Sequence, residues 1–169
     1  MDILLVDGYN IIGAWPELRV LKDQDLALAR DILVSKMAEY QAYTGYRVLV
    51  VFDAHLSQGI ETKYKNHRVE VIYTRENETA DERIEKLAIS LSDIRTQIHV
   101  ATSDFTEQWA IFGQGALRKS ARELLNETNA IENRIKKKVT NFTNEKPSKR
   151  IELNTELSAI FEKWRRGQR

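Results

Sequence analysis

Short apolar runs alternate with longer amphipathic stretches along the chain. Residues 2–6 and 47–52 are apolar nearly throughout, a pattern typical of strands that helices cover on both faces, and residues 98–101 predict another strand. Over residues 69–73 apolar and polar side chains alternate, which predicts a further strand that is more exposed than the others. We therefore expect at least four strands, connected by helices and loops.

Apolar residues at helical spacing fill the segments between these runs. One helix is predicted from about residue 26 to Gly45, and another begins at Thr79, whose hydroxyl can cap it. Strands that alternate with helices favour a right-handed, parallel arrangement. The expected fold class is α/β, with three layers (α/β/α) and a mostly parallel central sheet.

The C-terminal part of the chain has a different pattern. Ser120 and Glu123 match a capping box that opens a long helix, and residues 141–150, which contain Pro147, indicate a linker. A last apolar stripe at helical spacing predicts a helix that packs back on the same domain. We therefore expect a domain at residues 1–140, followed at 141–169 by a linker and a C-terminal helix that form a basic extension.

Four aspartates fall where a parallel sheet brings side chains together. Asp7, Asp53 and Asp104 follow apolar runs, and Asp81 lies in the first turn of the helix that begins at Thr79. The ligand crevice of such sheets lies beyond the carboxyl ends of the strands. Gathered carboxylates repel one another unless a cation neutralises them, and oxygen ligands suit Mg²⁺ or Mn²⁺. We expect a divalent metal site at this edge, although a single aspartate more often serves a turn or a cap.

Other polar residues near the strand ends are candidates for binding. Asn10 follows Asp7 by three residues, so its amide can hold a carboxylate, a metal-bound water or a phosphate oxygen, or simply cap the turn. Hydroxyl or cationic groups for a phosphate are offered by Thr102, Ser103, Arg118, Lys119 and Arg122. Local helix capping is the alternative role for the two hydroxyls.

The aromatic and histidine side chains have weaker signals. Tyr9 and Trp15 can stack on a nucleobase, but packing is the more common use of such residues. His99 lies inside a predicted strand, where we expect a structural role. His55 follows Asp53 by two residues and is a candidate for substrate contact or proton transfer.

Composition and charge narrow the class of protein. The 169 residues include no cysteine, which excludes disulfides and thiolate metal sites. No stretch has the length and apolar character of a signal peptide or a membrane span, so we expect a cytoplasmic protein. Residues 118–169 hold 14 lysines and arginines against 7 acidic residues, whereas residues 1–117 hold 12 against 18. This asymmetry suits a polyanion held near a metal centre, or else a solvated, lysine-rich helix.

Six short motifs together resemble a known family. They are Val6-Asp7-Gly8-Tyr9-Asn10, Val51-Phe52-Asp53-Ala54, Glu78-Thr79-Ala80-Asp81, Thr102-Ser103-Asp104, Ser120-Ala121-Arg122-Glu123-Leu124 and Trp164-Arg165-Arg166-Gly167. In this order they resemble the YacP-like branch of the NYN domains, relatives of the PIN-domain nucleases. Each motif is weak alone, but the six in register cover nearly the whole chain.

The resemblance implies a PIN-like fold and an endoribonuclease that depends on Mg²⁺ or Mn²⁺. It implies Asp7, Asp81 and Asp104 as metal ligands, Asp53 as a nearby acidic partner, and Asn10 as a further catalytic-site residue. The chain is similar in particular to the ribosome-associated endoribonuclease of that branch, so messenger RNA and the ribosome are the implied partners.

Two other classes of function remain open on the residues alone. Asp53, Thr102 and Lys119 loosely imitate the phosphoacceptor site of a receiver domain, although Gly8 stands where a receiver has a second acid. An RNA- or ribosome-binding adaptor whose acidic cluster holds only structural metal is the second alternative.

Overall fold

A computed structural model of the protein describes residues 1–54, 68–103, 115–165 and 167, with the backbone alone for 142–162 and 164. The chain divides into two units, Met1–Asn129 and Ala130–Arg169. The first unit contains a sheet of five described strands, all parallel, in the order β3-β2-β1-β4-β5. The strands are β1 (Asp2–Asp7), β2 (Arg47–Phe52), β3 (Glu70–Tyr73), β4 (Gln97–Ala101) and β5 (Leu117–Lys119).

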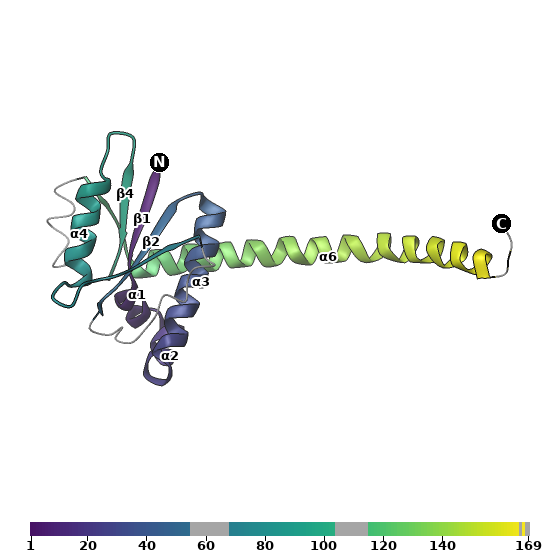
Figure 1. Ribbon diagram of the computed structural model, residues 1–169, viewed down its shortest axis with the longest axis horizontal. Coiled ribbons are helices and arrows are strands. Elements are labelled where there is room, and N and C mark those ends of the chain that lie inside the picture. Colours follow the sequence, from purple (N-terminus) through teal and green to yellow (C-terminus); the bar gives the residue numbers. More distant parts are fainter. Residues whose placement is uncertain (55–67, 104–114, 166, 168–169) are drawn as a thin grey trace. The chain divides into compact units, whose positions relative to one another are not determined.

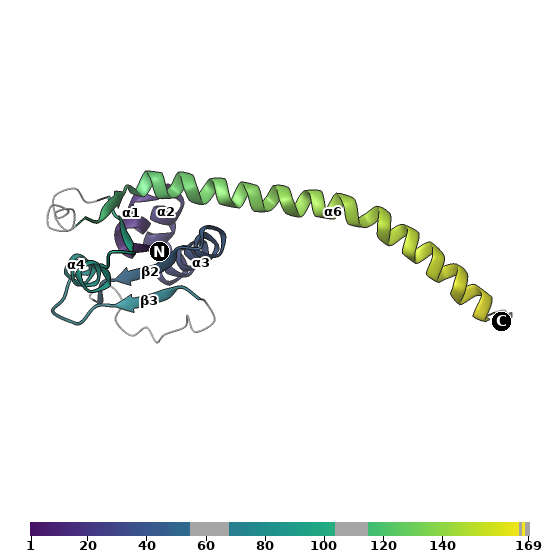
Figure 2. The same ribbon diagram turned by 90° about the horizontal axis from the view of Figure 1, so that it is seen from above.

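Helices cover both faces of this sheet, as the nearly uniform apolar runs predicted. Within the first unit, α4 (Ala80–Leu91) lies on one side of the strands and α3 (Leu26–Thr44) on the other (Figure 1). Two short helices, α1 (Gly8–Ala14) and α2 (Pro16–Gln24), join β1 to α3. Figure 2 shows β2 and β3 side by side and pointing the same way. The expected three-layer α/β/α fold is therefore confirmed.

Alternation along the strands assigns their side chains to the two layers. Ile3 and Leu5 of β1 belong to one core cluster with Leu49 and Val51 of β2 and the buried residues of α4. Successive side chains of a strand point to opposite faces, so Leu4 and Val6 face the layer of α1 and α3. Burial of these apolar side chains is the main stabilising contribution to the first unit.

Local signals account for the ends of several helices. Asp25 accepts a hydrogen bond from the amide of Leu28 at the start of α3, and Gly45 ends that helix in the left-handed conformation with φ 78°. The predicted capping box is present: Glu123 N–H donates to Ser120 Oγ, and Ser120 N–H donates to the carboxylate of Glu123, both at 3.1 Å.

The C-terminal helix differs from the expectation. α6 runs without interruption over Ala121–Arg165, through residues 141–150, where the sequence predicted a linker. A proline removes one backbone donor and disturbs one turn, while the turns on either side keep their own hydrogen bonds, so Pro147 does not end the helix. The division at residue 140 and the packing of residues 141–169 on the domain stay predictions.

Candidate active site

The carboxyl ends of three adjacent strands meet at one edge of the sheet. β1 is central, and its register pairs Asp7 with Val51 of β2 and Val6 with Ala101 of β4. The residues that directly follow β2 and β4 therefore flank Asp7. They include Asp53 on one side and the segment that begins at Thr102 on the other.

Asp7 ends β1 and directly precedes α1. Its side chain continues the row of Ile3 and Leu5, and this row faces α4. Only 7% of Asp7 is exposed, although its carboxylate is strongly hydrophilic. A carboxylate is rarely buried unless it is hydrogen-bonded or neutralised, and its place at the carboxyl end of the central strand makes Asp7 a candidate site residue.

Asp81 lies in the first turn of α4, the helix that packs on this layer of the sheet. Thr79 precedes α4, and its hydroxyl accepts a hydrogen bond of 3.2 Å from the amide of Glu82. Ala80 is buried in the cluster that contains Leu5, so the first turn of α4 packs on the sheet, and Asp81 lies in that turn. The partial positive charge of a helix N-terminus favours a carboxylate at this position.

Glu78 holds the start of α4 in place. Its buried carboxylate lies 2.7 Å from the ammonium of Lys86 and 2.9 Å from Nε of Arg83, both on the following helix. The hydrogen bond from Lys86 is the largest of the effects that lower the pKa of Glu78, and Arg83 acts in the same direction. Glu78 therefore stays ionised and fixes the turn that precedes Asp81.

Asn10 lies in the first turn of α1 and contacts the segment after β4. Its Oδ1 accepts hydrogen bonds from the backbone amide of Ser103 at 2.6 Å and from the Ser103 hydroxyl at 2.7 Å. The Thr102 amide in turn donates to the carbonyl of Lys119 on β5. The amide of Asn10 thus ties together two strand ends at the candidate site.

Gly8 allows α1 to begin directly against β2. A Cβ atom at this position would lie 2.3 Å from Cε1 of Phe52, a distance that real side chains do not tolerate. The ring of Phe52 packs between Tyr9 and Tyr73, with centroid separations of 5.0 and 5.8 Å. Close packing, rather than a special backbone angle, therefore requires a glycine next to Asp7.

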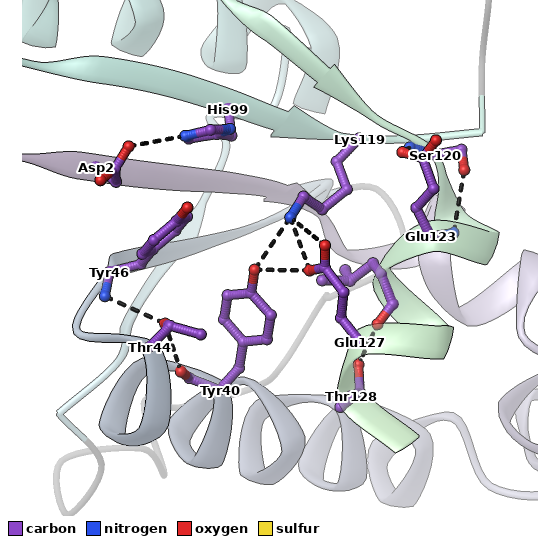
Figure 3. Close-up of polar contacts among 11 residues, drawn as sticks. Asp2, Tyr40, Thr44, Tyr46, His99, Lys119, Ser120, Glu123, Glu127 and Thr128 are labelled. Atoms are coloured by element: carbon purple, nitrogen blue, oxygen red, sulfur yellow. Dashed lines mark hydrogen bonds and ion pairs between the residues drawn. The ribbon is translucent and has the colours of Figure 1, made fainter. Parts of the chain in front are cut away.

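Lys119 of β5 forms a hydrogen-bond network with Tyr40 of α3 and Glu127 of α6, drawn in Figure 3. Its ammonium donates to both carboxylate oxygens of Glu127, at 2.8 and 2.7 Å, and to the hydroxyl of Tyr40 at 3.1 Å. The Tyr40 hydroxyl donates to Glu127 at 2.8 Å. Burial by itself lowers the pKa of Lys119, but the hydrogen bonds with Glu127 and Tyr40 outweigh it and the net pKa is raised. The structure thus gives Lys119 a role in anchoring α6 to α3 and β5.

A pocket of about 620 Å³ opens beside the segment after β4. Ser103, Arg118 and Arg122 contribute to its lining, and all three were predicted as phosphate contacts. Trp15 forms part of its wall and is only 2% exposed, and its Nε1–H donates to the carbonyl of Ala121 at 2.8 Å. Trp15 therefore packs, as expected, and is not placed to stack openly on a base.

The structure describes three of the four aspartates at the predicted metal site. Asp104 and His55 lie outside the described part of the chain, and within the part that is described no three acidic or histidine side chains gather as a metal site. The described candidates, Asp7, Asp53 and Asp81, offer the hard oxygen donors that Mg²⁺ and Mn²⁺ prefer. Their chemistry fits such an ion, and the metal assignment stays a prediction.

Several supporting residues were not expected from the sequence. Glu78, Phe52, Tyr40 and Glu127 hold the elements that carry the candidate residues, but only Glu78 had a local signal, its position before a helix cap. His99 takes the structural role that was predicted: its Nε2 lies 3.0 Å from the carboxylate of Asp2. No helix among the described residues is long and apolar enough to cross a membrane.

Comparison with known proteins identifies the family that the chain matches. The YacP-like NYN domain matches residues 4–166. The chain is 69% identical over 167 residues to the YacP protein of Bacillus subtilis (strain 168), covering 99% of this chain and 98% of that protein. The crystal structure of Rae1 (YacP) from Bacillus subtilis has a TM-score of 0.81 at 68% identity, with 99% of this chain and 97% of that chain covered. The structure of its W164L mutant has a TM-score of 0.77, covering 86% of each chain.

Proposed function

The chain belongs to the YacP-like NYN domain family, a nuclease family, and on this premise we propose that it is a metal-dependent endoribonuclease. One observation carries the proposal. The central strand ends in the buried Asp7, which faces the layer of α4, and the first turn of α4 carries Asp81. The carboxyl end of this strand is the sheet edge where ligands bind in α/β folds, and α4 packs on the same layer of the sheet, which supports a shared site for the two carboxylates.

The proposed metal ligands are Asp7, Asp81 and Asp104, with Asp53 as an acidic neighbour. A bound Mg²⁺ or Mn²⁺ lowers the pKa of a water molecule and neutralises charge on a phosphodiester. The residues themselves have separate tasks. Asp7 and Asp81 supply oxygen donors from a strand end and a helix start, and Asn10 fixes the segment that leads to Asp104.

RNA contacts are proposed for the cationic and hydroxyl groups beside this edge. Ser103, Arg118 and Arg122 line one pocket, and guanidinium groups recognise phosphate oxygens by charge-assisted hydrogen bonds. Thr102 is buried, and we assign it to the support of this segment. Lys119, whose ammonium is bonded to Glu127 and Tyr40, is left out of the proposed RNA contacts.

Metal dependence and two substitutions test the reaction. We expect Asp7→Asn and Asp81→Asn to abolish cleavage of RNA while the proteins stay folded, and EDTA to stop the unmodified enzyme. Asp31→Asn is the matched control, because Asp31 is an exposed residue of α3. Full activity of both site variants, or full activity in EDTA, would contradict the proposal.

The finer proposal is that the substrate is messenger RNA on the translating ribosome, in the cytoplasm. It rests on the resemblance to the ribosome-associated endoribonuclease of this branch, and the excess of basic residues in the C-terminal part agrees with it physically. Translated and untranslated copies of one messenger RNA, incubated with the protein and with its Asp81→Asn variant, test it by mapping of new ends. Equal cleavage of both copies would support nuclease activity but contradict a role for the ribosome.

The structure disfavours a receiver-type phosphoacceptor. That reading needs a lysine that reaches the phosphoryl group on Asp53, whereas Lys119 binds Glu127 and Tyr40. RNA binding that persists with metal present, but without cleavage of any RNA, would instead support the adaptor.

A further inference from the structure

The pocket beside Ser103 has two chemically different sides. Its apolar side is formed by Ala14, Trp15 and Pro16 from the α1–α2 junction and by Leu125 from α6. The remaining lining residues include Ser103, Arg118 and Arg122. None of the described residues that line it is acidic, so the pocket is suited to a ligand with a flat apolar part and a negative charge.

The pocket lies next to the proposed reaction site. Ser103, one of its lining residues, donates two hydrogen bonds to Asn10, which follows Asp7 by three residues. These two hydrogen bonds connect the lining of the pocket to the helix that directly follows Asp7. Single-stranded RNA is recognised through bases that leave the stack and lie on apolar or aromatic surfaces.

The walls of the pocket are held in place before any ligand binds. The hydrogen bond from Trp15 to the Ala121 carbonyl links the α1–α2 junction to the start of α6, and the capping box orders the same turn of α6. Leu124 and Thr128 anchor that helix by burial on the domain side. A preformed wall reduces the entropy lost when a base is bound.

We propose that this pocket is a subsite for one unstacked nucleotide of single-stranded RNA, adjacent to the phosphodiester at the aspartates. The base lies on the apolar wall of Ala14, Pro16 and Leu125, and Arg122 binds its phosphate. The volume of about 620 Å³ is sufficient for a nucleotide. The proposal rests on RNA being the substrate, but it concerns binding and not the cleavage step.

Binding of short labelled RNAs in EDTA tests the subsite without cleavage. The probes are one hexanucleotide and a set of six copies, each with the base removed at one position, measured by fluorescence anisotropy. For the unmodified protein we expect base removal at one position to weaken binding roughly tenfold, because the base loses its apolar contacts with the pocket. Removal at the remaining positions should have a smaller effect.

Two kinds of variant distinguish the contributions of the apolar and polar sides of the pocket to RNA binding. Leu125→Trp fills the apolar side and keeps every charge, so it should weaken the intact RNA to the level of the sensitive abasic copy. Ala14→Leu, at the rim of the same side, serves as a second filling variant if the first has a lowered melting temperature. Arg122→Ala should weaken all RNAs alike, and Arg95→Ala, an exposed arginine at the amino edge of the sheet, should change nothing.

The outcomes distinguish the subsite from the nuclease. An equal effect of base removal at every position, or a position effect that both filling variants retain, would overturn the subsite. If the position effect is found but no RNA is cleaved in Mg²⁺, the subsite stands and the nuclease assignment fails. If RNA is cleaved in Mg²⁺ but no position effect is found, the nuclease stands and the subsite fails.

Discussion

Asn10 accepts two hydrogen bonds from Ser103, a residue 93 positions later in the chain, at 2.6 and 2.7 Å. The bonds connect the first turn of α1, the helix after the central strand, to the segment after the neighbouring strand β4. Ser103 also lines the pocket that we assign to a nucleotide. One side-chain amide therefore links the proposed metal site to the proposed RNA contacts.

Replacement of Asn10 should disturb both stability and activity. Asn10→Ala leaves the amide and hydroxyl of Ser103 without this acceptor, so we expect the free energy of unfolding to fall by about 1–3 kcal/mol. Ser103→Ala removes only the hydroxyl donor and should have the smaller effect. Urea denaturation and the rate of RNA cleavage measure the two properties. Equal stability of Asn10→Ala and the unmodified protein would show that the link is not structural.

The two glycines of α1 should respond in opposite directions to alanine. Gly8→Ala places a Cβ atom 2.3 Å from the ring of Phe52, and such overpacking costs about 1–3 kcal/mol. Gly13→Ala meets no atom within 4 Å and restricts the unfolded chain, so we expect it to stabilise by roughly 0.5–1 kcal/mol. Melting temperatures of the pair test the prediction. A destabilised Gly13→Ala and an unchanged Gly8→Ala would contradict it.

The network of Tyr40 predicts a loss of stability in alkaline solution. Burial raises the pKa of Tyr40 to about 12 from an unfolded value of 10.0, so the unfolded state releases its proton first. The stability that depends on the protonated Tyr40 hydroxyl is fully present below pH 10 and is lost as the pH rises through about 12. The raised pKa of Lys119 changes the stability in the same direction.

Tyr40→Phe tests this dependence directly. The variant should be less stable at pH 7 by about 1 kcal/mol, because it loses the bonds with Lys119 and Glu127, and stability should decline less between pH 10 and 12. Tyr43→Phe, at a more exposed tyrosine of α3, is the control and should keep the decline. Urea denaturation at stepwise pH values gives the comparison. An unchanged alkaline decline in Tyr40→Phe would assign the effect to other groups.

The lowered pKa of Glu78 predicts the opposite pH dependence, a loss of stability in acid. The pKa of Glu78 is lowered in the folded state, so its stabilising effect is present above the unfolded value and is lost as the pH falls through the folded one. Glu78→Gln should have a lower melting temperature at pH 7, and the difference should close in acid. Glu76→Gln, in the exposed turn before it, is the matched control. A difference that stays constant with pH would point to packing instead of charge.

Local pattern was enough to predict much of the fold. The strands β1, β2 and β4, the span of α3, the cap of α4 and the capping box of α6 depend on periodicity or on residues a few positions apart. The short helices α1 and α2 and the three-residue strand β5 were not in the predicted pattern. Such short elements contain too few residues to show a periodicity, and packing stabilises them more than their own sequence does.

The sequence by itself determined the elements and the chemical kinds of residue at the sheet edge, because both depend on local order along the chain. Only the tertiary structure decided the partners. A sequence shows that Lys119 is cationic, but the approach of α3 and α6 gives it Tyr40 and Glu127 as partners. In the same way, the adjacency of β1 and β4 brings Asn10 to Ser103. These contacts join residues distant in the chain, and the packing of whole elements, to which every buried side chain contributes, sets their distances.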